Sequence, residues 1–141
     1  VELLTSAGIP VMAHLGLTPQ SVHQFGGYKG QGRGEAGQRL ILDAKHMEQA
    51  GAFATVLEVV PADLAEAVTR AVSVPTIGIG AGPHTDAQVL VWQDMMGLTP
   101  GKAPKFVKQY ADLRSIMTDA VQTWAGEVVA GTYPGPEHEY H

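Results

Sequence analysis

The fold of this protein is decided by the stretch Phe53-Ala54-Thr55-Val56-Leu57-Glu58-Val59-Val60. Its residues are apolar or β-branched with one exception, a composition typical of a strand covered on both faces in a parallel sheet. Pro61 ends the strand, because proline has no N–H to donate to a neighbouring strand. The exception is Glu58, a carboxylate at a position where charge is costly, so this residue is the first candidate for chemistry.

Further strands and helices are predicted on both sides of this strand. The predicted elements are a strand over 11–16, a helix over 35–50, the strand over 53–60, a helix over 62–72, a strand over 75–80 and a strand over 88–92. Short strands that alternate with helices are typical of βα units on a parallel sheet.

The C-terminal part of the sequence predicts one long helix. Its apolar residues recur at spacings of three and four, and they are Leu113, Ile116, Met117, Ala120, Val121, Trp124 and Val128. Gly131 and Pro134 close it. The apolar face could pack equally on its own domain or on another subunit, and both arrangements stay open.

Four strands in series suit either an open doubly wound sheet or half of a closed (β/α)8 TIM barrel, which typically needs about 250 residues. The length of 141 residues and a first residue, Val1, that is not an initiator Met favour half a barrel. We therefore expect residues 1–141 to be one α/β partial barrel domain of roughly the last four βα units, with the N-terminal half absent and the N-terminus made by processing, cloning or proteolysis. Two strand edges would then lack partners, so a complementary N-terminal segment is expected.

Composition excludes several classes of function. The net charge of −5 offers no electrostatic footprint for nucleic acid, and we interpret Lys102, Lys105 and Lys108 as a solvated face. No apolar stretch approaches the roughly 18 residues that span a bilayer, so we expect no membrane span. The absence of Cys excludes disulfides, a thiolate nucleophile and a cysteine zinc site, and it is compatible with a reducing compartment.

Two polar residues occupy corresponding places near the ends of predicted strands. Glu58 lies near the end of its strand, which in a parallel barrel faces the active site, and His14 has the matching place on the strand over 11–16. Both side chains would then point toward the same mouth of a barrel. The sequence leaves open whether Glu58 is a general base or part of an interior ion pair with Arg or Lys. It also leaves open whether His14 contacts a ligand or is a hydrogen-bonded core residue.

Two glycine-rich segments are candidates for contact between the backbone and a ligand. The first, Gly32-Arg33-Gly34-Glu35-Ala36-Gly37, matches the dinucleotide fingerprint G-x-G-x-x-G, and Glu58 follows about 20 residues later. Residues 25–31 before it form a polar loop rather than a strand, so a long active-site loop is the preferred interpretation. In the second segment, Gly80 and Gly82 follow a predicted strand and either expose amides to an anion or form a tight turn.

Four separated motifs follow one another along the chain. They are His14-Leu15-Gly16-Leu17-Thr18-Pro19-Gln20-Ser21, then Phe25-Gly26-Gly27-Tyr28-Lys29 with Gln31-Gly32-Arg33-Gly34, then Leu57-Glu58-Val59-Val60-Pro61, then Ile77-Gly78-Ile79-Gly80-Ala81-Gly82. The series closely resembles the ketopantoate hydroxymethyltransferase family. The similarity continues through Gln88-Val89-Leu90-Val91 to the tail Tyr133-Pro134-Gly135, so it covers nearly the whole chain.

The resemblance implies a fold and an activity. It implies a TIM barrel of the phosphoenolpyruvate-utilising type that transfers a hydroxymethyl group from methylene-tetrahydrofolate to 3-methyl-2-oxobutanoate, giving 2-dehydropantoate in pantothenate biosynthesis. Mg²⁺ would chelate the keto acid and stabilise its enolate as a Lewis acid. By resemblance Glu58 is the base that takes the C3 proton, and His14 lies in the substrate pocket and helps to order it.

The resemblance also implies what this chain lacks. The family's metal-binding carboxylates belong to the N-terminal half, so we expect no metal ligands in this chain and no activity from the chain alone. A homo-oligomer, by family a decameric ring, and a cytoplasmic location are implied as well. Gly30 and Ala87 depart from the family pattern, which puts loop rigidity in question. The alternatives left open are a dinucleotide-binding domain that uses residues 32–37 and a non-catalytic half-barrel binding module.

Overall fold

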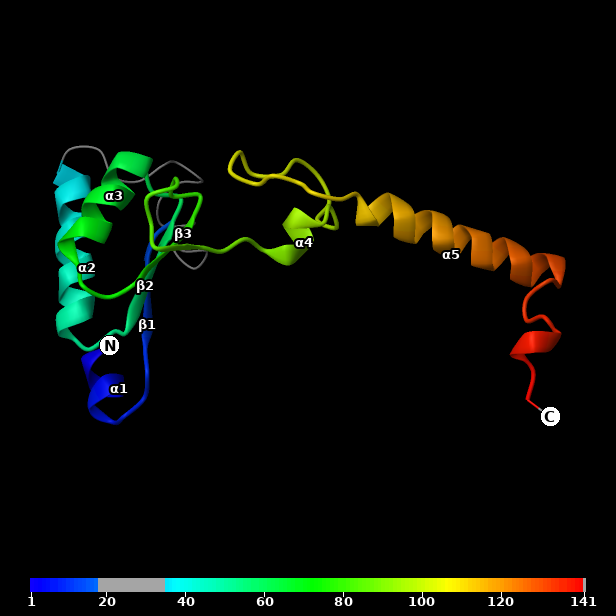
Figure 1. The fold of residues 1–141 in the computed structure, drawn as a ribbon, viewed down its shortest axis with the longest axis horizontal. Helices are drawn as coiled ribbons and strands as arrows, with labels where there is room; N and C mark the ends of the chain where they lie inside the picture. The colour runs from blue at the N-terminus through cyan, green and yellow to red at the C-terminus, as the bar shows by residue number, and fades with distance from the viewer. Residues whose placement is uncertain (18–34, 141) are drawn as a thin grey trace. The chain divides into compact units, whose positions relative to one another are not determined.

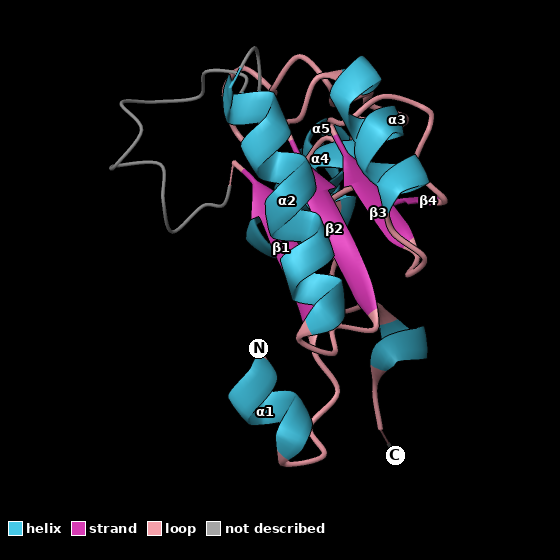
Figure 2. Ribbon diagram, turned by 90° about the vertical axis from the view of Figure 1, so that its left-hand side faces the viewer, coloured by secondary structure: helices cyan, strands magenta, loops and turns pink. Residues whose placement is uncertain are grey.

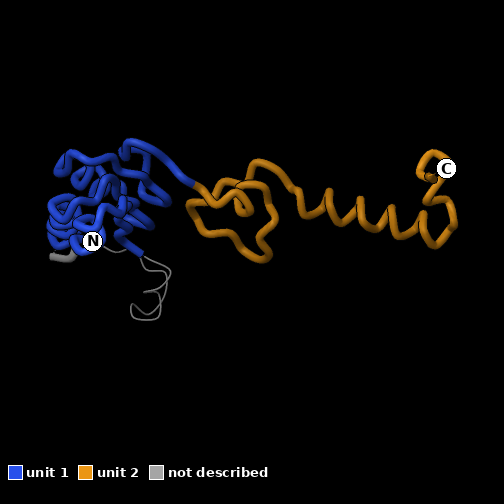
Figure 3. Tube along the Cα trace, turned by 90° about the horizontal axis from the view of Figure 1, so that it is seen from below, with its two compact units in different colours: residues 1–89 blue, residues 90–141 orange. Residues whose placement is uncertain are grey.

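The computed structural model describes residues 1–17 and 35–140 of the chain. They divide into two compact units, Val1–Val89 and Leu90–His141 (Figure 3). The motifs that fall on residues 18–34 lie outside the described residues, and so does Gly32-Arg33-Gly34 of the candidate dinucleotide fingerprint.

The first unit is a parallel α/β sheet (Figure 1). Its elements are α1 (Glu2–Ser6), β1 (Met12–Gly16), α2 (Glu35–Gln49), β2 (Ala54–Glu58), α3 (Ala62–Ala71), β3 (Thr76–Ile79) and β4 (Ala87–Gln88). The four strands are all parallel and lie next to one another in chain order, β1-β2-β3-β4. The predicted α/β class is confirmed, and the first three strands and the two helices between them begin and end close to the predicted residues.

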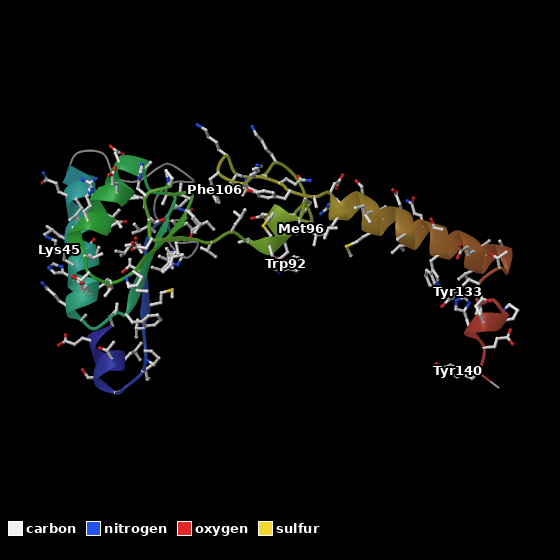
Figure 4. The ribbon with its side chains drawn as sticks, viewed as in Figure 1. Lys45, Trp92, Met96, Phe106, Tyr133 and Tyr140 are labelled. Carbon is white, nitrogen blue, oxygen red and sulfur yellow. The ribbon has the colours of Figure 1, made fainter. Side chains whose placement is uncertain are left out.

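Helices α2 and α3 cover one face of this sheet, and they lie in front of the strands in Figure 2. Side chains alternate between the two faces of a strand, and Leu57 of β2 points toward the helices. There it packs in one buried cluster with Ala44 of α2 and with Ala65 and Val68 of α3. Lys45, next to Ala44, points away from the sheet (Figure 4). Burial of these apolar stripes explains why both helices form at their predicted positions.

The opposite face of the sheet carries no helix among the described residues of this unit. Met12 is 47% exposed, whereas the next residue, Ala13, is buried under the helices. By the same alternation Val56 and Glu58 lie on the open face. Among the described residues of the first unit the predicted cover of residues 53–60 is therefore met on one face only, by the helix layer.

The fourth strand is shorter than predicted. The apolar run over 88–92 predicted a strand, but pairing with β3 is confined to Ala87–Gln88, and helix α4 (Trp92–Met95) begins soon afterwards. Val89 and Val91 are both 47% exposed. Within the described part of the chain no further strand lies beyond β4. The backbone of residues 89–91 therefore has no strand on that side with which to pair.

Asp86 connects the start of β4 to the start of β3. Its Oδ2 accepts hydrogen bonds from the Thr76 N–H at 2.8 Å and from the Thr76 hydroxyl at 3.0 Å, and Thr76 is fully buried. Asp86→Ala removes this acceptor from a buried N–H, so we expect the free energy of unfolding to fall by about 1–3 kcal/mol. Asp86→Asn keeps an oxygen acceptor and should lose less. Urea denaturation of both variants measures the difference, and equal losses would contradict this role of the side-chain oxygen.

The second unit contains the predicted long helix as α5 (Leu113–Ala130). Asp112 caps it by accepting hydrogen bonds from the Ser115 hydroxyl at 2.7 Å and the Ser115 N–H at 3.2 Å, and these bonds hold the pKa of Asp112 below its usual value. Gly131 ends α5 in the left-handed conformation, as predicted from the sequence. Tyr133 lies near the end of α5 (Figure 4) and packs edge-on against Trp124, with ring centroids 6.5 Å apart.

The apolar face of α5 is open to solvent. Its residues Ile116, Met117, Val121 and Trp124 are all more than half exposed. None of the helices in the described ranges is long and apolar enough to cross a membrane. The face predicted from the three- and four-residue spacing therefore exists, and it is not buried within its own unit.

Candidate active site

Glu58 is the last residue of β2 and lies at the carboxyl end of the parallel sheet. Its neighbour Leu57 packs into the helix layer, so the Glu58 side chain points to the open face. The carboxyl ends of the strands are where parallel α/β sheets carry their functional side chains. The location of Glu58 at a strand end is as predicted from the sequence.

His14 lies within hydrogen-bond distance of Glu58, with 2.9 Å between His14 Nε2 and Glu58 Oε2. The strand register pairs Gly16 with Glu58 and His14 with Val56, so the two side chains are diagonal neighbours on adjacent strands. The His14 side chain is 39% exposed and that of Glu58 only 16%. The predicted approach of the two side chains on one side of the sheet is therefore observed, and the carboxylate is the more shielded partner.

Among the described residues the side-chain partner of Glu58 is an imidazole. Among the described residues, Arg and Lys form ion pairs only as Arg39–Asp43 and Arg70–Glu66, both within single helices. Glu58 is paired with an imidazole instead. Each ring nitrogen of an imidazole can donate or accept a hydrogen bond, depending on the tautomer. The pair is therefore suited to accepting and releasing a proton.

The end of β1 lies in close contact with the backbone of Glu58. The Leu17 N–H donates to the Glu58 carbonyl at 2.9 Å. Gly16 has a φ of +96°, and a Cβ at this position would collide with the same carbonyl and come within 2.8 Å of Val60 Cγ2. A larger residue at position 16 would push β1 away from β2. Gly16 therefore allows the strand separation at which His14 reaches Glu58.

Two glycines, Gly80 and Gly82, follow the carboxyl end of β3, the end of the sheet at which Glu58 lies. Gly80 and Gly82 both have positive φ, at 63° and 75°. A Cβ on Gly82 would collide with Ala62 at the start of α3, and the Gly82 carbonyl accepts a hydrogen bond from Gln88 Nε2 at 2.9 Å. These contacts give Gly82 a packing role in a tight turn. A role for Gly80 or Gly82 in ligand binding remains a prediction.

The described residues form no metal-binding cluster around this pair. The ranges that the structure describes contain no group of three or more His, Asp or Glu side chains that could hold a metal ion. Mg²⁺ favours octahedral coordination by oxygen atoms. Because Mg²⁺ usually keeps several waters and takes only one or two protein carboxylates, Glu58 alone does not define such a site.

Two features of this site were not predicted from the sequence. The first is the direct contact between His14 and Glu58, for which the only signal was that both are polar residues near strand ends. The second is the backbone at Val59, which has a φ of +52°. Val strongly favours extended backbone, so no local pattern indicates this conformation.

The first unit is an α/β sheet protein in which a carboxylate and an imidazole meet at the carboxyl end of the parallel strands, where such sheets carry their active sites. Comparison with known sequences agrees with the α/β class and identifies the family. The sequence profile of the family described as ketopantoate hydroxymethyltransferase matches residues 1–136. The chain belongs to this family.

Curated relatives carry a corresponding enzyme name. The chain is 64% identical to a 3-methyl-2-oxobutanoate hydroxymethyltransferase of Streptomyces coelicolor, 63% to one of Streptomyces avermitilis and 60% to one of a Nocardioides species. The matches cover 100%, 100% and 99% of this chain but 48%, 49% and 48% of those proteins. The chain thus spans about half the length of the curated relatives it matches.

Proposed function

We propose that this chain is the C-terminal half of a (β/α)8 barrel that transfers a hydroxymethyl group from methylene-tetrahydrofolate to 3-methyl-2-oxobutanoate, giving 2-dehydropantoate for pantothenate synthesis. Family membership supports the reaction, and the half-length match supports the half-barrel. On this proposal residues 1–141 are one partial barrel domain. The single observation that carries the chemistry is the 2.9 Å contact between His14 and Glu58 at the carboxyl end of the sheet.

The sheet topology supports half a barrel over an open doubly wound sheet. In a doubly wound sheet the strand order reverses at a switch point, with helices on both faces. Here the order is β1-β2-β3-β4 without a reversal, and the packed helices α2 and α3 lie on one face. A closed barrel has this arrangement, with helices outside and the other face turned toward the barrel interior. Met12, Val56 and Glu58 would then face the interior.

Glu58 is proposed as the base that takes the single proton from C3 of the keto acid. The electron pair of that C–H bond remains on the substrate as its enolate and would form the new C–C bond to the methylene carbon of the folate. Both bonds from this carbon to the folate nitrogens then break, water supplies the hydroxyl oxygen, and the C3 proton and one water proton end on the two nitrogens. His14 would order the substrate and, through Nε2, hold the Glu58 carboxylate beside it. A partly shielded carboxylate with a hydrogen-bonding imidazole is a suitable acceptor for such a proton.

Mg²⁺ is proposed to be bound mainly by the missing half, with methylene-tetrahydrofolate as the cosubstrate. The metal ligands are assigned to the N-terminal half of the barrel, because the family resemblance implies that its metal-binding carboxylates lie there. There the ion would act as a Lewis acid on the keto acid. Gly80 and Gly82 are proposed to contact the substrate through their backbone, and the packing role of Gly82 is the competing explanation.

Two partners follow from the surfaces of this chain. A complementary N-terminal segment would pair with the exposed edges of β1 and β4 and cover the open face of the sheet. A second copy of the protein would cover the apolar face of α5, in a homo-oligomer for which the family suggests a decameric ring. A metabolic enzyme of this kind is proposed to work in the cytoplasm.

The proposal is tested with a completed enzyme, in which this chain follows the N-terminal half of the Streptomyces coelicolor relative. Proton NMR should detect loss of the C3 proton of 3-methyl-2-oxobutanoate in D₂O with Mg²⁺, before any folate is added. The 141-residue chain alone should give no exchange, because it lacks the proposed metal ligands. Exchange by the chain alone would contradict the assignment of these ligands to the other half. No exchange by a folded completed enzyme would contradict the proposed reaction.

The alternatives give different results with the same material. A dinucleotide-binding domain that uses residues 32–37 would bind NAD(P), which fluorescence titration detects. A stand-alone binding module would run as a single monodisperse species in native mass spectrometry. Family membership over residues 1–136 includes the fingerprint segment and supports the transferase instead.

A further inference from the structure

Val59, the residue after the candidate base, has an unusual backbone conformation. Its φ of +52° is the only positive φ of a non-glycine residue in the described part of the chain. A left-handed backbone is unfavourable for any L-residue with a Cβ, and for a β-branched residue it is a genuine outlier. Such strain persists only where the surrounding structure determines it, and it concentrates at functional sites.

The left-handed residue changes which way the next side chains point. In regular strand geometry successive side chains alternate between the faces of the sheet, so Val60 would share the open face with Glu58. Instead Val60 is only 3% exposed and belongs to the same helix-side cluster as Leu57. The turn at Val59 therefore keeps Glu58 on the open face while it returns the next residue to the core, as the extra residue of a β-bulge does.

Hydrogen bonds on both sides hold this conformation. The Val59 N–H donates to the Ile79 carbonyl of β3 at 2.9 Å, and the Glu58 carbonyl accepts from the Leu17 N–H at 2.9 Å. The peptide between Glu58 and Val59 is thereby held by the segments that end β1 and β3. The third contact is that of the Glu58 side chain with His14. The carboxylate is thus fixed by its own backbone as well as by its side-chain partner.

We propose that Val59 is a positioning residue, whose left-handed backbone holds the Glu58 carboxylate on the open face within reach of His14. The inference rests on the proposed function, in which Glu58 takes the substrate proton. The competing explanation is that Val59 only ends β2 and leads the chain into α3. The two explanations differ in what happens when the backbone at residue 59 is made free to leave the left-handed region.

The test uses two variants of the completed enzyme. Val59→Gly removes the steric cost but also frees the backbone, because Gly populates both signs of φ. Val59→Asn keeps a side chain that tolerates the left-handed conformation. We expect the limiting rate of C3 deuterium exchange to fall by about 10-fold or more in Val59→Gly, with little change in the KM for the keto acid. Val59→Asn should keep most of the wild-type rate, and the melting temperature of both variants should equal or exceed that of the wild type.

A second measurement separates this inference from the proposed reaction. The ¹⁵N chemical shifts of the His14 imidazole report its hydrogen bond to Glu58 without any turnover. In Val59→Gly these shifts should move toward those of Glu58→Ala, which removes the hydrogen-bond partner altogether, and in Val59→Asn they should stay at the wild-type values. If Val59→Gly leaves both the exchange rate and the His14 shifts unchanged, the positioning role is overturned. If the His14 shifts respond while Glu58→Gln has no effect on exchange, the positioning role stands and the proposed reaction fails.

Discussion

Glu58→Gln in the completed enzyme is expected to lower the rate of deuterium exchange at C3 of 3-methyl-2-oxobutanoate by about 10²–10⁴-fold, the usual contribution of a positioned general base. Glutamine has nearly the shape of glutamate and can still hydrogen-bond to His14 Nε2. It cannot accept the substrate proton as a carboxylate does. The loss should therefore appear in the limiting rate of exchange and much less in the binding of the keto acid.

The matched control is Glu66→Gln, the same change on α3. Glu66 pairs with Arg70 of the same helix at 2.6 Å, and it is not part of the proposed site. We expect the exchange rate of Glu66→Gln to equal that of the wild type. Proton NMR of the keto acid in D₂O measures all three proteins under the same conditions. Equal rates for Glu58→Gln and the wild type would show that another group takes the C3 proton.

Leu57→Ala is expected to lower the free energy of unfolding by about 2–5 kcal/mol, because it removes a fully buried side chain and leaves a cavity. Leu57 lies in the cluster that joins β2 to both helices, where it packs with Ala44, Ala65 and Val68. These residues belong to three different elements. Loss of the contact should therefore weaken the whole first unit rather than one helix.

The control for this prediction is Leu42→Ala. Leu42 lies on α2 as well but is 51% exposed, so the same truncation there should change the free energy of unfolding by no more than about 0.5 kcal/mol. Urea denaturation followed by circular dichroism measures both variants. A loss at Leu57 as small as that at Leu42 would contradict the assignment of Leu57 to the core.

Secondary structure was predictable where a local pattern was long enough to carry it. The helix α5 follows from apolar residues at three- and four-residue spacing, and Gly131 marks its end because glycine adopts the left-handed conformation readily. The strand β2 follows from a continuous apolar and β-branched run that Pro61 closes. The prediction failed for residues 88–92, where apolar character alone suggested a strand. Whether an apolar run continues in a sheet depends on a neighbouring strand, which the local sequence does not specify.

The candidate site was predictable in part. Glu58 and His14 could be chosen from the sequence because charge and polarity are unusual within apolar strands. Their contact could not be, since they are 44 residues apart and meet only through the register of β1 on β2. The need for Gly16 has the same origin, because a Cβ there collides with an atom of the next strand rather than with its own segment.

What the sequence by itself determined is the type and order of most elements, the family and the residues capable of chemistry, because periodicity, turn residues and motifs are properties of short segments. Only the tertiary structure decided that an imidazole is the partner of Glu58, that β4 stops after Gln88 and that Val59 is left-handed. Each of these depends on the distance or hydrogen bonding between separate strands. Such contacts are set when the whole sheet packs on its helices, so no single segment encodes them.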